Sequence, residues 1–118
     1  MEQQDTIRIL ISPITVAELQ EVAKERFGDM VKAVVDIEKK SMAIGGELHA
    51  DEEALLLDNG SKQGDLWGIN IYVDQPRESW LEFDSMINIR PSQNNRSRSV
   101  EDLALQNKII KLVDELVK

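Results

Sequence analysis

The sequence predicts an α+β fold: a mainly antiparallel sheet of about four to five strands, with two main helices and one short helix packed on it. Residues 66–73 and 80–90 alternate apolar and polar side chains as strands do, whereas 16–27 and 103–117 repeat apolar residues at helical spacing. Short polar turns join neighbouring elements. The order helix, hairpin, short helix, hairpin, helix favours helices packed against one face of the sheet.

The composition is that of one soluble domain spanning 1–118, in which we expect 1–5 to be frayed. A net charge of −8 argues against general nucleic-acid binding and against binding to anionic membranes. The absence of cysteine excludes disulfides, thiolate metal sites and cysteine nucleophiles. The chain shows neither a signal-peptide pattern nor an apolar run long enough to span a membrane, so we expect a cytoplasmic protein.

The amino-terminal part predicts a short strand followed by a capped helix. Residues 6–11 form an apolar run that a proline soon interrupts. Thr15 and Glu18 have the spacing of a capping box, in which each side chain satisfies a backbone N–H at the helix start. The apolar residues that follow recur at helical spacing and end at Gly28, a natural helix stop.

The next segments predict a hairpin and then a short helix. Residues 30–38 alternate like a half-buried strand, and 41–44 form the returning strand after a short lysine turn. Residues 48–59 begin with acids, which favour the positive end of a helix, and continue with three leucines. A helix that stops at Gly60 is the main prediction there, and a strand through 54–57 is the alternative.

The second half predicts another hairpin and a long final helix. Residues 66–73 form one strand. Residues 80–90 alternate over their whole length, which is the clearest strand pattern in the chain, and Pro91 ends it. Ser99 is the expected cap of the final helix, whose apolar residues make a wide stripe over 103–117.

The loop after the last predicted strand is the first candidate site. Between Arg90 and Ser99 it carries three arginines and no acid, although the whole chain has a net charge of −8. Guanidinium groups and the free N–H groups of a helix start bind phosphate and carboxylate. The alternative is a solvated loop whose arginines pair with the acids of the chain itself. The predicted residues of this anion or phosphate-ligand site are Arg90, Asn95, Arg96, Ser97 and Arg98.

A row of polar residues on the last predicted strand is the second candidate. The residues expected on one face are Glu82, Asp84, Asn88 and Arg90. Two carboxylates two residues apart can share a proton or hold a divalent cation, and Asn70 on the neighbouring strand is close enough to join them. The alternative is the ordinary solvent-facing side of an antiparallel sheet.

His49, the only histidine, is the third candidate. A single histidine excludes a multi-histidine metal site, but with nearby acids such as Glu53 it is a candidate general base. The alternative is a helix cap or a surface residue. The sequence contains no glycine-rich phosphate loop and no nucleophile elbow, and we assign it no cofactor and no metal site.

Two long segments carry a family resemblance. They read ELHADEEALLLDNGSKQGDLWGINIYVD (47–74) and WLEFDSMINIRPSQNNRSRSVED (80–102), and the closing KIIKLVDELVK is part of the same pattern. They resemble the signature blocks of a small prokaryotic family known only as domain of unknown function 5674. The resemblance implies no activity, substrate or cofactor. The chain departs from the family pattern at Asn94, where glycine is expected, and asparagine is the commonest non-glycine residue at positive φ.

Three functions follow as expectations. The first is a small binding or regulatory module whose arginine loop holds a small anionic or phosphorylated ligand. The second is a small hydrolase or other enzyme, with or without a metal, that uses Asp84 and Glu82 with His49. The third is a homodimer or partner-binding protein that associates through the apolar stripe over 103–117.

These functions differ in whether two separate segments of the chain lie close together in space. His49, Asp84 and Arg98 converging in one cleft would have the composition of an active site. The same residues on separate faces would be ordinary polar surface. The sequence leaves open whether 49–53 and 82–98 share a cleft.

Overall fold

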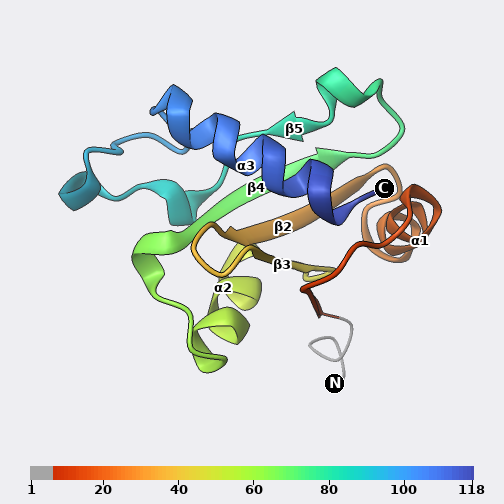
Figure 1. Cartoon of the computed structure of the whole chain (residues 1–118), viewed down its shortest axis with the longest axis horizontal. Helices are drawn as coiled ribbons and strands as arrows, with labels where there is room; N and C mark the ends of the chain where they lie inside the picture. Colours follow the sequence, from red (N-terminus) through yellow and green to blue (C-terminus); the bar gives the residue numbers. More distant parts are fainter. Residues whose placement is uncertain (1–6) are drawn as a thin grey trace.

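Within residues 7–118, which the computed structural model describes, a five-stranded antiparallel sheet forms the centre of the molecule (Figure 1). The prediction for residues 1–5 lies outside this range. The strand order is β1-β3-β2-β4-β5, and every neighbouring pair is antiparallel. The strands are β1 (Arg8–Leu10), β2 (Met30–Asp36), β3 (Ser41–Ile44), β4 (Leu66–Tyr72) and β5 (Leu81–Glu82).

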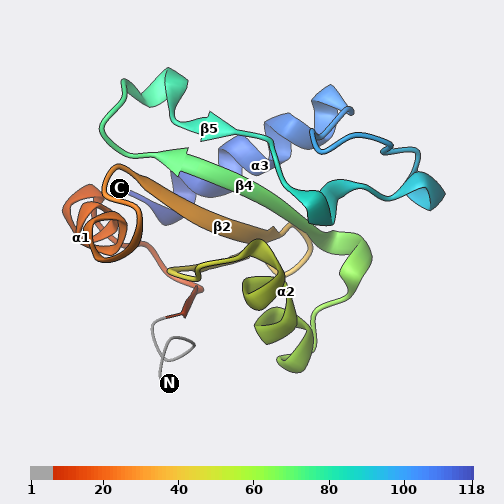
Figure 2. The same ribbon diagram turned by 180° about the vertical axis from the view of Figure 1, so that it is seen from behind.

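The α-helices of the described chain are α1 (Val16–Arg26), α2 (His49–Asp58) and α3 (Leu103–Leu116). Helix α3 crosses one face of the sheet, and α2 lies on the opposite face, as the view from behind shows (Figure 2). The predicted α+β fold with an antiparallel sheet is therefore confirmed. The expectation that the helices share one face is wrong for α2. In the described part of the chain, no helix has the length and apolar character needed to cross a membrane.

The sheet is covered on both faces because each face carries apolar side chains. The larger core lies between one face and the buried side chains of α1 and α3. A smaller core on the other face consists of Val34, Ala43, Leu56 and Leu66. Val34 was expected on the solvent side of a half-buried strand, but α2 packs over β2 on that side and buries it completely.

The local signals at the helix ends are confirmed. The backbone N–H of Glu18 donates to Thr15 Oγ1 over 3.0 Å, and that of Thr15 donates to Glu18 Oε1 over 3.1 Å, so the capping box is complete. Gly28 follows α1 with a φ of 93°, which glycine adopts without steric cost. The segment 49–58 is a helix rather than the alternative strand, and Gly60, with a φ of 97°, follows its end.

The strand predicted over 80–90 is wrong beyond its first residues. Strand β5 contains only Leu81–Glu82, and the chain then leaves the sheet and forms a short 3-10 turn at Met86–Asn88. The cause lies on the neighbouring strand. Ser85 packs so closely on Gly68 that a Cβ at position 68 would lie 2.6 Å from the Cβ of Ser85.

A side chain replaces the backbone pairing that a longer β5 would have made. Asn88 Oδ1 accepts the N–H of Gly68 at 2.8 Å, and Asn88 Nδ2 donates to the Gly68 carbonyl at 3.0 Å. The amide of one residue thus satisfies both polar groups of a strand residue. The chain can therefore cross the face of the sheet instead of extending its edge.

The last helix begins later than the sequence predicts. Asp102 is the N-cap instead of Ser99, and its Oδ1 accepts the N–H of Ala104 at 2.9 Å. The side chain of Asn95 donates to the carbonyls of Ser97 at 3.2 Å and Ser99 at 2.7 Å. These bonds hold the residues before α3 in a loop. Because Asp102 is the N-cap, the positive end of α3 faces the carboxylate of Asp102.

Glu52 is a buried acid in the first turn of α2. Its Oε2 accepts the N–H of Gly46 at 2.9 Å, whereas Oε1 has no hydrogen-bond partner within residues 7–118. Glycine is needed at position 46, because a Cβ there would lie 2.8 Å from Glu52 Cγ. Burial raises the pKa of Glu52 well above its ordinary value, and this effect exceeds the lowering by the Gly46 hydrogen bond.

We expect the wild-type protein to lose stability between about pH 5 and about pH 8 because Glu52 ionises there. The Glu52→Gln variant should not show this loss. Because the folded-state pKa of Glu52 lies above the unfolded-state value, its contribution is complete below the unfolded-state pKa and is lost as pH rises through the folded-state pKa. Urea unfolding of both proteins at the two pH values measures this. A difference in unfolding free energy between the two proteins that stays constant with pH would contradict it.

Candidate functional site

Segments far apart in the sequence meet in one cleft on the α2 side of the sheet. A cavity of about 230 Å³ has His49 from α2, Asp84 from the segment after β5 and Arg98 from the loop before α3 in its lining. Lys32 of β2 and Asn70 of β4 belong to the same lining. We call this cavity, defined by these five residues, the His49 pocket. Segments 49–53 and 82–98 therefore share a cleft, which the sequence alone left undecided.

The sheet contributes two neighbouring side chains to the floor of the pocket. Lys32 and Asn70 are directly paired across β2 and β4, so their side chains lie on the same face. The ammonium group of Lys32 lies 5.3 Å from the centroid of the Phe27 ring and makes no ion pair or hydrogen bond with any described side chain. Lys32 thus brings an uncompensated positive charge to the pocket.

Asn70 is a buried amide that is only half satisfied. Its Nδ2 donates to Glu82 Oε1 at 2.9 Å and, less closely, to the carbonyl of Asp84 at 3.4 Å. Its Oδ1 is buried and has no hydrogen-bond partner in the described chain, although the residue is only 7 % exposed. A buried acceptor without a partner costs about 1–3 kcal/mol. A ligand that carries a donor would relieve this cost.

His49 is a buried, neutral imidazole in the first turn of α2. Its Nε2 lies 2.8 Å from the carbonyl oxygen of Ile69, which can only accept, so Nε2 carries the hydrogen and Nδ1 is the basic nitrogen. Burial lowers the pKa of His49 below its ordinary value. The positive charges of Lys32 and Arg98 lower this pKa further, while the Ile69 bond and Asp84 act in the opposite direction.

Arg98 is held in place by its backbone and by Asp84. Its carbonyl accepts hydrogen bonds from the backbone of Ser85 and from the side chain of Asn88, both at 3.0 Å. Its Nε donates to Asp84 Oδ1 at 2.6 Å. The terminal guanidinium nitrogens make no hydrogen bond with the rest of residues 7–118, so they are available to a ligand.

The charges in the pocket differ from those of the whole chain. Lys32 and Arg98 are cationic and Asp84 is anionic, which gives a local charge of +1 beside a neutral histidine, whereas the chain carries −8. The side chains of Arg98 and Asp84 are 55 % and 40 % exposed, so water screens these charges in part. The net positive charge still suits the pocket to a small anion.

Arg90 has a different environment from Arg98. It donates through Nη1 to the carbonyl of Gln63 and through Nη2 to that of Leu66, and its guanidinium lies 4.0 Å from the centroid of the Trp67 ring. The residue is 9 % exposed. Its guanidinium therefore joins the loop to β4, which reduces its availability to a ligand.

The other predicted residues of the arginine loop bond mainly to the loop itself. Asn95 Nδ2 donates to the carbonyl of Asn88 at 2.7 Å, and its Oδ1 accepts the N–H of Glu101 at 2.9 Å. The carboxylate of Glu101 accepts the N–H of Arg96 at 3.1 Å. Hydrogen bonds from Ser97 above all, and from this N–H, lower the pKa of Glu101. An acid of the chain thus lies where the sequence predicts an anionic ligand, and ligand binding there stays a prediction.

Asn94 adopts a backbone conformation of the kind that glycine favours. It follows a short turn with a φ of 61° and a ψ of 27°, in the left-handed region that favours glycine. Asparagine tolerates this region better than other non-glycine residues. The turn can therefore form with asparagine at this position.

The predicted row of polar residues on the last strand does not form, because β5 ends at Glu82. Glu82 Oε1 accepts hydrogen bonds from Asn70 and, at 3.0 Å, from the hydroxyl of Tyr72. Asp84 instead points to Arg98. Among residues 7–118, no group of three or more histidines and acids is placed to hold a metal ion. A catalytic role for either carboxylate stays a prediction.

Lys32 is the pocket residue that sequence reasoning missed. Its position on the polar side of an alternating strand was visible in the sequence. Its pairing with Asn70 depends on the register between β2 and β4, which joins residues far apart in the chain. That register was the missing information.

The fold and the pocket define an α+β protein with a small, locally cationic cavity between α2 and the segment 84–98. The chain belongs to the family described as "Protein of unknown function (DUF5674)", whose model matches residues 8–116. The family expected from the two sequence blocks is thereby confirmed. No curated protein and no solved structure gave a significant match to the chain.

Proposed function

We propose that this protein binds a small anionic molecule in the His49 pocket. The observation that carries the proposal is the convergence of Lys32 and Arg98, two cations with unused donor groups, beside the neutral His49 in one cavity. Ammonium and guanidinium groups are the side chains that proteins use to bind phosphate and carboxylate. The proposed ligand is of the anionic or phosphorylated class that the arginine loop predicts. Of the residues predicted in that loop, Arg98 is the one that lines this pocket.

The neutral groups of the pocket define the rest of the ligand. Asn70 Oδ1 and His49 Nδ1 can both accept a hydrogen bond, and neither has a partner within the described chain. A ligand that combines an anionic group with a hydroxyl would satisfy them together with the two cations. The cavity of about 230 Å³ is small for a drug-sized ligand. Small hydroxy acids and phosphorylated polyols are therefore the ligand class that we propose.

Binding of inorganic phosphate and of glycolate is expected to shift the amide NMR signals of the pocket and to raise the unfolding free energy. At about 100 times its Kd, a ligand adds roughly 2.7 kcal/mol. We expect Arg98→Ala and Lys32→Ala each to weaken binding several-fold, because each removes a cation from the pocket. Titrations followed by NMR, with urea unfolding in parallel, measure both effects.

Arg96→Ala is the matched control for this test. It removes the same residue type from the same loop, and both arginines are exposed, but Arg96 lies outside the pocket lining. Equal losses of affinity in Arg96→Ala and Arg98→Ala would mean that the charge of the whole loop, and not the pocket, attracts the anion. Unchanged spectra with both anions would remove the proposal.

Acid–base catalysis on the bound anion is the second candidate function, and the free Nδ1 of His49 favours it. A neutral histidine can take a proton from a ligand hydroxyl or from water, while Arg98 and Lys32 stabilise negative charge on the ligand. Asp84 raises the pKa of His49, so it favours the imidazolium that proton transfer would form. Glu82 is engaged with Asn70 and Tyr72.

Hydrolysis of p-nitrophenyl phosphate and p-nitrophenyl acetate tests this second function. If His49 is the base, His49→Gln should lower the rate by about 100-fold or more. Asp84→Asn should shift the acidic limb of the pH profile to lower pH, because it removes a charge that raises the pKa of His49. A rate that survives His49→Gln would exclude this role.

Association through the stripe over 103–117 has less support than the two functions above. The buried members of the stripe in α3 are Ile109, Leu112, Val113 and Leu116. They pack into the larger core of their own chain. The exposed apolar residues of α3, Leu103 and Ile110, are the part of the stripe that a partner could contact.

A further inference from the structure

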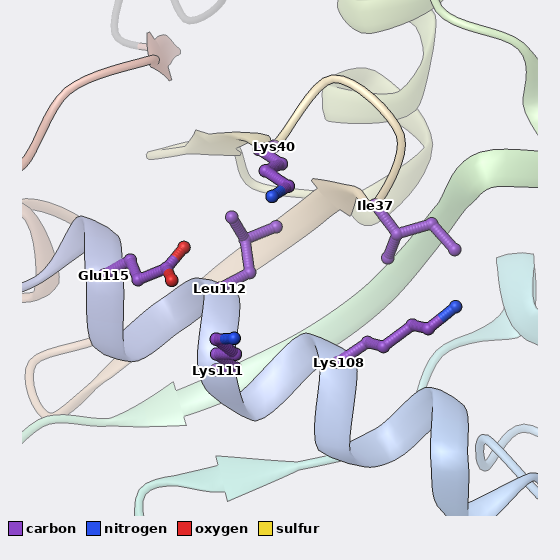
Figure 3. Close-up of a pocket in the computed structure, with 6 residues that line it drawn as sticks. All are labelled: Ile37, Lys40, Lys108, Lys111, Leu112 and Glu115. Atoms are coloured by element: carbon purple, nitrogen blue, oxygen red, sulfur yellow. The ribbon is translucent and has the colours of Figure 1, made fainter.

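A second cavity lies between α3 and the turn that joins β2 to β3, on the side of the sheet opposite the His49 pocket (Figure 3). Its volume is about 270 Å³. Its lining residues are Ile37, Lys40, Lys108, Lys111, Leu112 and Glu115, and we call it the lysine pocket.

Positive charge dominates this cavity. Three lysines and one glutamate line it, which gives a local charge of +2 in a chain of −8. Figure 3 shows Lys40 and Glu115 reaching toward Leu112, whereas the Lys108 side chain extends away from Leu112 toward the Ile37 side of the cavity. None of the three ammonium groups makes a hydrogen bond or an ion pair with another residue in 7–118, in contrast to Lys24, which pairs with Glu21 at 3.5 Å. None of the three lysines is therefore neutralised by a direct ion pair, although Glu115 offsets one of their charges.

The backbone of Lys40 gives a second, independent indication. Lys40 has a φ of 57°, in the left-handed region. The other positive-φ positions of the described chain are glycines and Asn94, which tolerate this conformation. A long side chain at such a position costs about 1–2 kcal/mol relative to glycine, and backbone strain of this kind concentrates at functional sites. A lysine at this turn is thus disfavoured by the fold itself.

The floor of the cavity is apolar. Leu112 is 5 % exposed and Ile37 is half-buried, and both belong to or pack against the larger core. A free inorganic anion would satisfy the lysines but leave this floor in water. A ligand with an anionic group and an apolar body would use both features of the cavity.

We infer that the lysine pocket binds a small organic anion with an apolar group, of the phosphate monoester class. The phosphate is neutralised by Lys40 and Lys111, Lys108 adds positive charge at the Ile37 side of the cavity, and the apolar group contacts Ile37 and Leu112. This site shares no residue with the His49 pocket. The inference therefore does not depend on the proposed function.

Phenyl phosphate is the probe for this inference, and amide NMR titration with the full chain is the measurement. We expect signals of Lys40, Lys108 and Leu112 to shift, with a Kd at least about threefold lower than that of inorganic phosphate, because only phenyl phosphate covers the apolar floor. Lys111→Ala and Lys40→Asn should each weaken binding by about two- to fivefold. Lys40→Asn keeps a residue suited to positive φ, so the turn should remain folded.

Two control variants separate this site from its alternatives. Lys24→Ala removes an exposed lysine outside both pockets, and Lys32→Ala weakens binding at the His49 pocket. Both should bind phenyl phosphate at the lysine pocket as the wild type does. Shifts confined to the His49 pocket would overturn the inference, as would equal Kd values for phenyl phosphate and inorganic phosphate. Wild-type affinity in both Lys111→Ala and Lys40→Asn would overturn it as well.

Discussion

The close approach of Ser85 and Asn88 to Gly68 is the constraint on which the His49 pocket depends. Because Gly68 has no side chain, the segment after β5 can lie directly on the sheet, and the Asn88 amide satisfies the polar groups of Gly68. The same Asn88 amide and the backbone of Ser85 then hold the carbonyl of Arg98. One contact thus ends β5 and fixes the backbone of an arginine in the pocket.

Much of the fold could be predicted because its signals are local. The capping box at Thr15, the hairpin strands and the helix after Leu48 are each determined by residues within a few positions of one another. The strand over 80–90 was mispredicted because an alternating pattern indicates only that every second side chain is buried. It does not identify the group that pairs with the backbone of the neighbouring strand. Whether a backbone or the side chain of Asn88 pairs with Gly68 is a property of two segments 20 residues apart. The late start of α3 has a local cause instead, because Asn95 bonds to the carbonyls of Ser97 and Ser99 within the same loop.

The candidate site was predictable in its residues more than in its arrangement. His49, Asp84 and Arg98 attract attention as chemically able side chains, but their convergence depends on how α2 and the 84–98 segment pack on the sheet. Arg90 resembles Arg98 in the sequence, yet its guanidinium stacks on Trp67 and bonds to backbone carbonyls. An arginine that supports the structure and one that is free to bind differ only in their three-dimensional environment.

The phosphate affinity of a Gly68→Ala variant shows whether the contact of Ser85 with Gly68 forms the His49 pocket. The added Cβ would collide with Ser85, so we expect a folded protein whose 84–98 segment is displaced and which no longer binds phosphate at the His49 pocket. NMR signals of the core beneath α3, such as those of Ile109, should remain close to those of the wild type. Adding Ser85→Gly should restore part of the affinity, because it removes the other partner of the collision. A Gly68→Ala protein that binds phosphate as tightly as the wild type would contradict the account.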